Sequence, residues 1–109
     1  MSLLNQFSQL SAILFNEYSV LPEAITVNAR LREDFGIDGD DVDALLIIIS
    51  EDFGVDWNGF TFHRYFHEEP HLFSLLFEWY YRRCYGALKT ITICHLLSVI
   101  ASKIWFEPA

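Results

Sequence analysis

Four aspartates within positions 38–43 form the densest group of chemically active side chains in this chain of 109 residues: Asp38, Asp40, Asp41 and Asp43. Clustered carboxylates suit Ca²⁺, but an EF-hand loop needs a glycine at its sixth position and a glutamate at its twelfth. Counted from Asp38, those positions hold Asp43 and Ile49. We therefore expect no specific metal site and no cofactor here, and only loose binding of divalent ions stays open.

Three histidines recur every fourth residue, at His63, His67 and His71. On one continuous helix this spacing would stack three imidazoles toward a metal. Pro70 interrupts any such helix, because proline lacks the backbone N–H that the helix ladder needs. We interpret the three histidines as polar loop residues rather than as a metal site.

Catalytic signatures are missing from the sequence. There is no recognisable nucleophile elbow, glycine-rich phosphate loop or pair of facing carboxylates, so we predict that the protein is not an enzyme. The formal net charge of -8, with 7 Lys and Arg residues, argues against nucleic acid and anionic membranes as partners. The high hydrophobic content, 52% of the residues, predicts one folded domain over residues 1–109 rather than disorder.

Compartment and membrane signals point to the cytoplasm. Cys84 and Cys94 lie ten positions apart, which is no metal or redox spacing, so we expect both thiols to be free. The first residues lack the basic region and cleavage site of a signal peptide. The uncharged run from Thr90 to Ser102 is too short to span a bilayer.

The chemistry-bearing residues need helices to position them. Apolar residues at helical spacing predict four helices, over about 2–17, 38–53, 72–83 and 92–104. Asp38 and Thr92 are the expected caps of the second and last helices, Ser2 that of the first, and Gly54 the stop of the second. The fold class is therefore mainly all-α, a small four-helix bundle.

Core positions follow from the same spacing. The stripe of the second helix is Val42, Leu45, Leu46, Ile49 and Phe53, and that of the last helix is Ile93, Leu96, Leu97, Ile100, Ala101 and Ile104. The segment that joins the first two helices is expected to be anchored in the core by Ile25, Val27 and Leu31. Asn58–Gly59 marks a turn.

An aromatic segment from Phe60 to Tyr85 interrupts the helical pattern. We interpret Phe60–Phe66 as a short extended piece and Leu72–Arg83 as a core helix, in preference to an interfacial membrane helix. A ligand pocket within the segment stays open, and its predicted lining is Trp57, Phe60, Tyr65 and Trp79.

The stretch from Ile25 to Trp57 reads ITVNARLREDFGIDGDDVDALLIIISEDFGVDW. It resembles the central part of an acyl carrier protein, in which Glu-Asp-Leu-Gly precedes Asp-Ser-Leu and an acidic helix closed by Phe. Residues 33–36 match the first element, and Leu45 and Phe53 match apolar helix positions. The segment TICHLLSVI at 92–100 resembles the last carrier helix. This resemblance implies a carrier-like bundle, similar to uncharacterised small bacterial proteins of that type.

Gly39 occupies the position at which a carrier has its serine. A glycine has no hydroxyl to receive phosphopantetheine, so the resemblance does not carry over the carrier's chemistry. It instead implies a non-catalytic interaction module, which docks an unidentified protein with a basic surface through its acidic second helix. Asp40, Asp41, Glu51 and Asp52 are the predicted contact residues. The alternatives are a carrier with its prosthetic group attached elsewhere, a small-ligand-binding protein that uses the aromatic segment, and charges that only keep the protein soluble.

Overall fold

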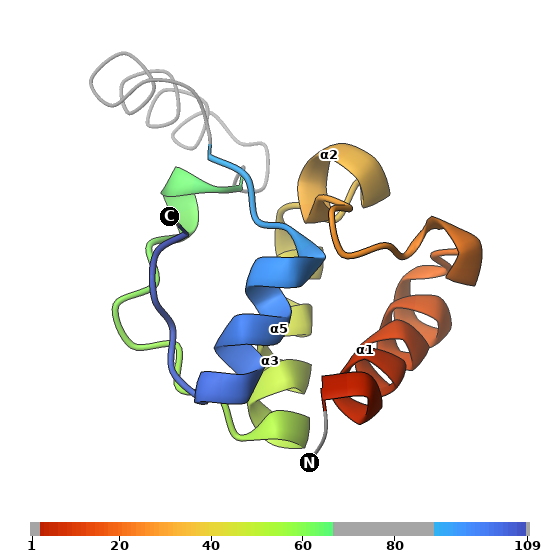
Figure 1. Cartoon of the computed structure of the whole chain (residues 1–109). Helices are drawn as coiled ribbons and strands as arrows, with labels where there is room; N and C mark the ends of the chain where they lie inside the picture. The colour runs from red at the N-terminus through yellow and green to blue at the C-terminus, as the bar shows by residue number, and fades with distance from the viewer. Residues whose placement is uncertain (1–2, 67–88, 109) are drawn as a thin grey trace, which may run out of the picture.

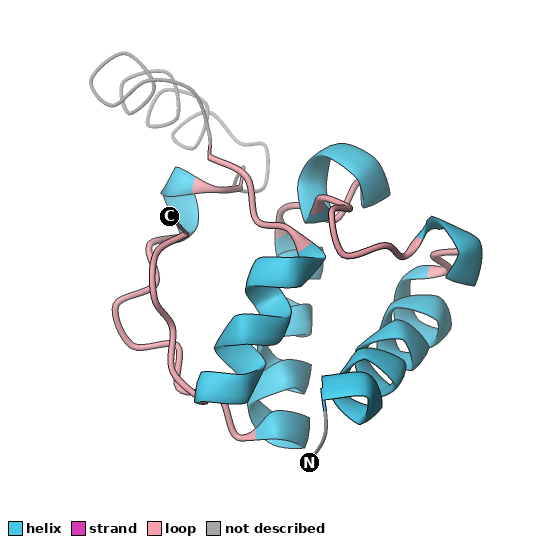
Figure 2. Cartoon of the chain, viewed as in Figure 1, coloured by secondary structure: helices cyan, strands magenta, loops and turns pink. Residues whose placement is uncertain are grey.

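A computed structural model describes residues 3–66 and 89–108. Its elements, in chain order, are α1 (Leu3–Tyr18), η1 (Pro22–Ala24), α2 (Leu31–Phe35), α3 (Asp40–Phe53), η2 (Phe62–Arg64) and α5 (Ile93–Ser102). Within these ranges the chain forms helices, short 3₁₀ turns and two isolated β-bridges, with no strand (Figure 2). The mainly helical fold class is therefore confirmed for the described residues. The predicted helix over 72–83 and the cap at Ser2 lie outside them.

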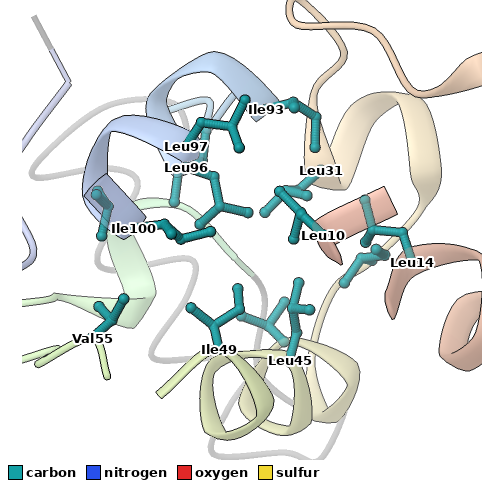
Figure 3. Packing of buried hydrophobic residues seen from close by; sticks show 14 of the residues in the cluster. Leu10, Leu14, Leu31, Leu45, Ile49, Val55, Ile93, Leu96, Leu97 and Ile100 are labelled. Atoms are coloured by element: carbon teal, nitrogen blue, oxygen red, sulfur yellow. The ribbon is translucent and has the colours of Figure 1, made fainter. Parts of the chain in front are cut away.

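One hydrophobic core joins the long helices. Leu10 and Leu14 of α1, Leu45 and Ile49 of α3, and Ile100 of α5 are fully buried and point into the same interior (Figure 3). α1 packs against α5 in this core, and in Figure 1 α5 is drawn in front of α3, with α1 to their right. The predicted stripe of α3 is confirmed, since its buried residues are Val42, Leu45, Ile49 and Phe53, with Leu46 packed against them.

The segment between α1 and α3 differs from the prediction. Ile25 and Leu31 are buried as expected, but the Val27 side chain is 48% exposed. This segment is held at Val27 by its backbone, because the Val27 carbonyl accepts the Cys94 N–H at 2.8 Å. The unpredicted helix α2 ends at Gly36, whose φ of 69° is the left-handed conformation of a helix stop.

Two further local predictions are corrected. Phe60–Phe66 is not extended, because η2 forms over Phe62–Arg64 within it. Helix α5 ends at Ser102, since Lys103 adopts a left-handed conformation with φ of 62°; Ile104 therefore leaves the buried stripe and is 56% exposed. Ala101 is exposed as well. The turn at Asn58–Gly59 is confirmed, with φ of 89° at Gly59.

The segment after α5, residues 103–107, runs back along the loop that follows α3; we call it the C-terminal strap. The Asp56 N–H donates to the Lys103 carbonyl at 2.9 Å, and the Trp105 N–H donates to the Asp56 carbonyl at 3.0 Å. The Tyr65 hydroxyl donates to the Glu107 carboxylate. The Lys103 ammonium donates to the Phe53 carbonyl at 2.8 Å, so the strap also contacts the last turn of α3.

The entry into α3 depends on Gly39, and the predicted cap at Asp38 is wrong. Gly39 is the N-cap, with φ of 59° and ψ of -134°. The Asp38 carboxylate accepts the Gly39 N–H at 2.9 Å, and the Asp41 N–H donates to the Asp38 carbonyl at 3.3 Å. This is the first central position of a type II′ turn, which glycine adopts without steric cost and other residues do not. The turn replaces the side-chain cap.

Thr92 caps α5 as predicted. Its hydroxyl accepts the His95 N–H at 3.1 Å, and its backbone pairs with Arg30 in an antiparallel bridge. The cap satisfies one N–H of the first turn that lacks a partner within the helix.

Replacing Gly39 with Asn should lower the free energy of unfolding by about 1–3 kcal/mol, because Asn tolerates the left-handed helical region but not the mirror-β region. Urea denaturation measures the loss. Gly36→Asn is the matched control, since Gly36 has φ of 69° and ψ of 19° and a Cβ there meets nothing within 4 Å. If the two variants lose equal free energy of unfolding, the turn at Gly39 is contradicted.

Replacing Thr92 with Ala should lower the free energy of unfolding by about 1 kcal/mol, because the hydroxyl cap is lost. Thr92→Ser keeps the acceptor and should stay close to wild type in thermal unfolding. If the Ala and Ser variants melt alike, the hydroxyl is not what stabilises the start of α5.

Candidate functional site: the outer face of α3

The solvent side of α3 carries two adjacent rows of residues at four-residue spacing. One row is Asp43, Ile47 and Glu51; the other is Asp40, Ala44, Ile48 and Asp52. Residues four apart are neighbours on a helix surface, so each row forms a ridge. Both rows begin and end with an acid and have apolar residues in the middle. We call these seven residues the outer face of α3.

The middle of the outer face is apolar yet exposed. Ile47 is 58% exposed, Ala44 is exposed and Ile48 is half-buried. The opposite side of the same turns holds Leu45 and Ile49, which are fully buried. These turns of α3 are therefore apolar all round, a pattern typical of a helix that is covered on every side.

Helix electrostatics separate the acids of the outer face into two groups. Asp40 and Asp43 lie in the first turn, where the positive end of the helix dipole stabilises a carboxylate. Glu51 and Asp52 lie in the last turn, where the negative end opposes a carboxylate by about 0.3–1 kcal/mol at an exposed site. The stability of α3 explains the first group but not the second.

The arginines of the described residues pair with other acids. A guanidinium nitrogen of Arg32 lies 3.6 Å from a carboxylate oxygen of Glu33, and one of Arg64 lies 3.4 Å from a carboxylate oxygen of Glu107. The guanidinium of Arg30 binds Asp34, and these hydrogen bonds, with that of the Arg30 backbone N–H, hold the pKa of Asp34 below its usual value. Within this part of the chain, no ion pair engages the side chains of Asp43, Glu51 or Asp52.

The four predicted contact residues are all exposed on α3: Asp40, Asp41, Glu51 and Asp52. Three of them belong to the outer face. Asp41 lies on the flank, where its carbonyl accepts the Tyr18 hydroxyl at 2.8 Å. The sequence did not identify Asp43 and Ile47 as contact residues. The four-residue spacing from Asp43 through Ile47 to Glu51 is the signal that could have identified them.

Tyr18 joins the end of α1 to the start of α3. Burial of its hydroxyl raises the pKa above the ordinary value of 10.0, and the negative charges of Asp41 and Glu17 raise it further. Because the folded-state pKa is raised, the stabilising contribution of Tyr18 is complete below pH 10 and is lost as the pH rises through the folded-state pKa.

The aromatic residues offered as a ligand pocket pack against one another instead. Trp105 of the strap is their common contact, with ring centroids 6.0 Å from Trp57, 4.9 Å from Phe60 and 5.6 Å from Tyr65. Tyr65 is 1% exposed. Tyr65 and Trp105 belong to the hydrophobic core, and Trp57 and Phe60 pack against it. Trp79, the fourth predicted lining residue, lies outside the described residues.

The described residues hold neither a metal-ligand cluster nor a helix that could cross a membrane. No group of three His, Cys, Asp or Glu side chains in residues 3–66 and 89–108 is placed to hold a metal ion. Two of the three spaced histidines, His67 and His71, lie outside those ranges. None of the helices described there has both the length and the apolar character needed to cross a bilayer. Cys94 is free and exposed.

The described fold and face define a small, mainly helical protein with an acidic and apolar helix surface. Comparison with family models shows that the chain belongs to the family described as Protein of unknown function (DUF1493), whose model matches residues 4–105. No curated protein and no solved structure matched the chain.

The resemblance to acyl carrier proteins is therefore wrong. The matching family model covers nearly the whole chain and is not that of a carrier, and nothing in the comparisons indicates one. The residues that suggested it have a local explanation. Residues 33–36 end α2 with a left-handed glycine, and Gly39 forms the turn that starts α3. Such helix stops and starts occur in many unrelated helical proteins.

Neutralising Asp41 by Asp41→Asn should lower the pKa of Tyr18 without bringing it to 10, because burial is the larger cause. Ring ¹³C chemical shifts against pH, assigned with Tyr18→Phe, measure the change. Glu23→Gln removes a charge elsewhere and should leave the titration unchanged. A Tyr18 pKa that does not respond to Asp41 would contradict the packing of α1 against the start of α3.

Proposed function

We propose that this protein is a non-catalytic docking module, which binds a protein with a basic surface through the outer face of α3. The observation that carries the proposal is the pair of acids in the last helical turn, Glu51 and Asp52. Their charge opposes the helix dipole, so it does not serve the stability of α3. A basic partner offers the compensation. We place this activity in the cytoplasm, in line with the sequence.

Solubility is the competing explanation for the same acids. A net charge of -8 keeps a small protein soluble wherever the charges lie on its surface. A docking surface instead requires the charges at particular positions, because association is steered by the local potential. The position of the charge, at constant net charge, therefore distinguishes the two functions.

The test reverses the last-turn acids by Glu51→Lys and Asp52→Lys together. The double variant should fold at least as stably as wild type, because lysines suit the C-terminal end of a helix. Immobilised on a resin, it should lose the proteins that wild type retains from a cytoplasmic lysate at low salt and releases as the salt is raised. Quantitative mass spectrometry of the eluates compares the variants.

The matched control is Glu17→Lys with Glu23→Lys, which changes the net charge equally outside α3. Both residues are exposed. It should keep the partners of wild type. If the two double variants retain the same proteins at the same salt dependence, the acids of α3 serve only as solvated surface.

A further inference from the structure

The apolar middle of the outer face calls for an explanation that a purely electrostatic surface does not supply. Charge alone steers a basic partner but does not require an exposed isoleucine between Asp43 and Glu51. Ile47 exposes 58% of its surface at the centre of the face, with Ala44 and Ile48 beside it. An apolar centre within a charged rim is the composition of a protein–protein docking surface.

We infer that the partner presents a basic amphipathic helix, whose apolar side chains cover Ile47 and whose Lys or Arg residues reach the acids at both ends. The inference rests on the proposed function. Because the outer face is acidic, charge complementarity requires a positively charged surface on the partner. The two parallel ridges fix its shape, because ridges at four-residue spacing pack into the grooves of another helix.

An extended partner strand fits the face less well. A strand gains affinity by hydrogen bonding to unpaired backbone groups at a sheet edge. The backbone N–H and C=O groups in the middle of α3 are already used by the helix itself. The contact must therefore be made by side chains, as it is between two helices.

The spacing of the acids sets the spacing of the partner's bases. Asp43 and Glu51 are eight residues apart, which is about 12 Å along a helix axis. Asp40 and Asp52 extend the acidic ends to twelve residues, about 18 Å. A partner helix aligned with α3 thus needs basic residues about two turns apart and one or two apolar residues midway between them.

The test uses two synthetic helical peptides of about 20 residues, long enough to form a helix in isolation. Both carry lysines eight positions apart. One has leucine at the two central positions, and the other has alanine there. Fluorescence anisotropy measures the affinity of each peptide for the full chain as the salt concentration is raised.

The leucine peptide should bind wild type more tightly than the alanine peptide and should keep more of its affinity at high salt. Ile47→Ala should lower the affinity of the leucine peptide about five- to tenfold, because the substitution removes the apolar contact. The same substitution should change the affinity of the alanine peptide by no more than about twofold, since the binding of that peptide is electrostatic. Ile104→Ala is the matched control, as Ile104 is 56% exposed outside α3.

The outcomes separate the two proposals. If both peptides bind wild type equally, or if Ile47→Ala changes nothing, the helical apolar contact is overturned while electrostatic docking stands. If neither peptide binds even at low salt, the basic-helix partner is overturned. Should Glu51→Lys with Asp52→Lys also leave the lysate proteins unchanged, the proposed function fails as well.

Discussion

Burial of the inner stripe of α3 is the interaction on which the rest of the structure depends. Val42, Leu45 and Ile49 are fully buried in the core that α1 and α5 complete. Burying side chains of this kind contributes roughly 1.5–3 kcal/mol each, far more than any exposed charge pair. The orientation of α3 is therefore fixed by its apolar side. Its acids are carried outward as a consequence, and a helix anchored in this way tolerates the unfavourable charges of its last turn.

The sequence predicted the elements whose signals are local and repeated. The stripe of α3, the first four residues of the stripe of α5, the cap at Thr92 and the stop at Gly54 follow from helical spacing and terminal residue types. The resemblance to carriers led to Gly39 being interpreted as a missing serine. Its role in the structure depends instead on its backbone conformation, which the residue types around it do not reveal. Val27 was misjudged because its backbone, not its side chain, holds the segment. Helix α2 was missed because five residues carry too little periodicity.

The outer face was only partly predictable for a related reason. Counting acids identified Asp40, Glu51 and Asp52, because charge is visible in the sequence. Ile47 was not singled out, since an isoleucine within a run of apolar residues looks like part of the core. Its exposure follows only from the rotation of α3 about its axis, which the packing of the opposite side determines. An exposed apolar residue on a helix is thus harder to predict than a charged one.

The C-terminal strap is part of the scaffold that supports α3. Lys103 donates to the last turn of α3, Trp105 is buried among the aromatic rings, and Glu107 accepts the Tyr65 hydroxyl. A tag or fluorescent fusion attached at Glu107 would therefore act on a segment that contacts both α3 and the aromatic rings.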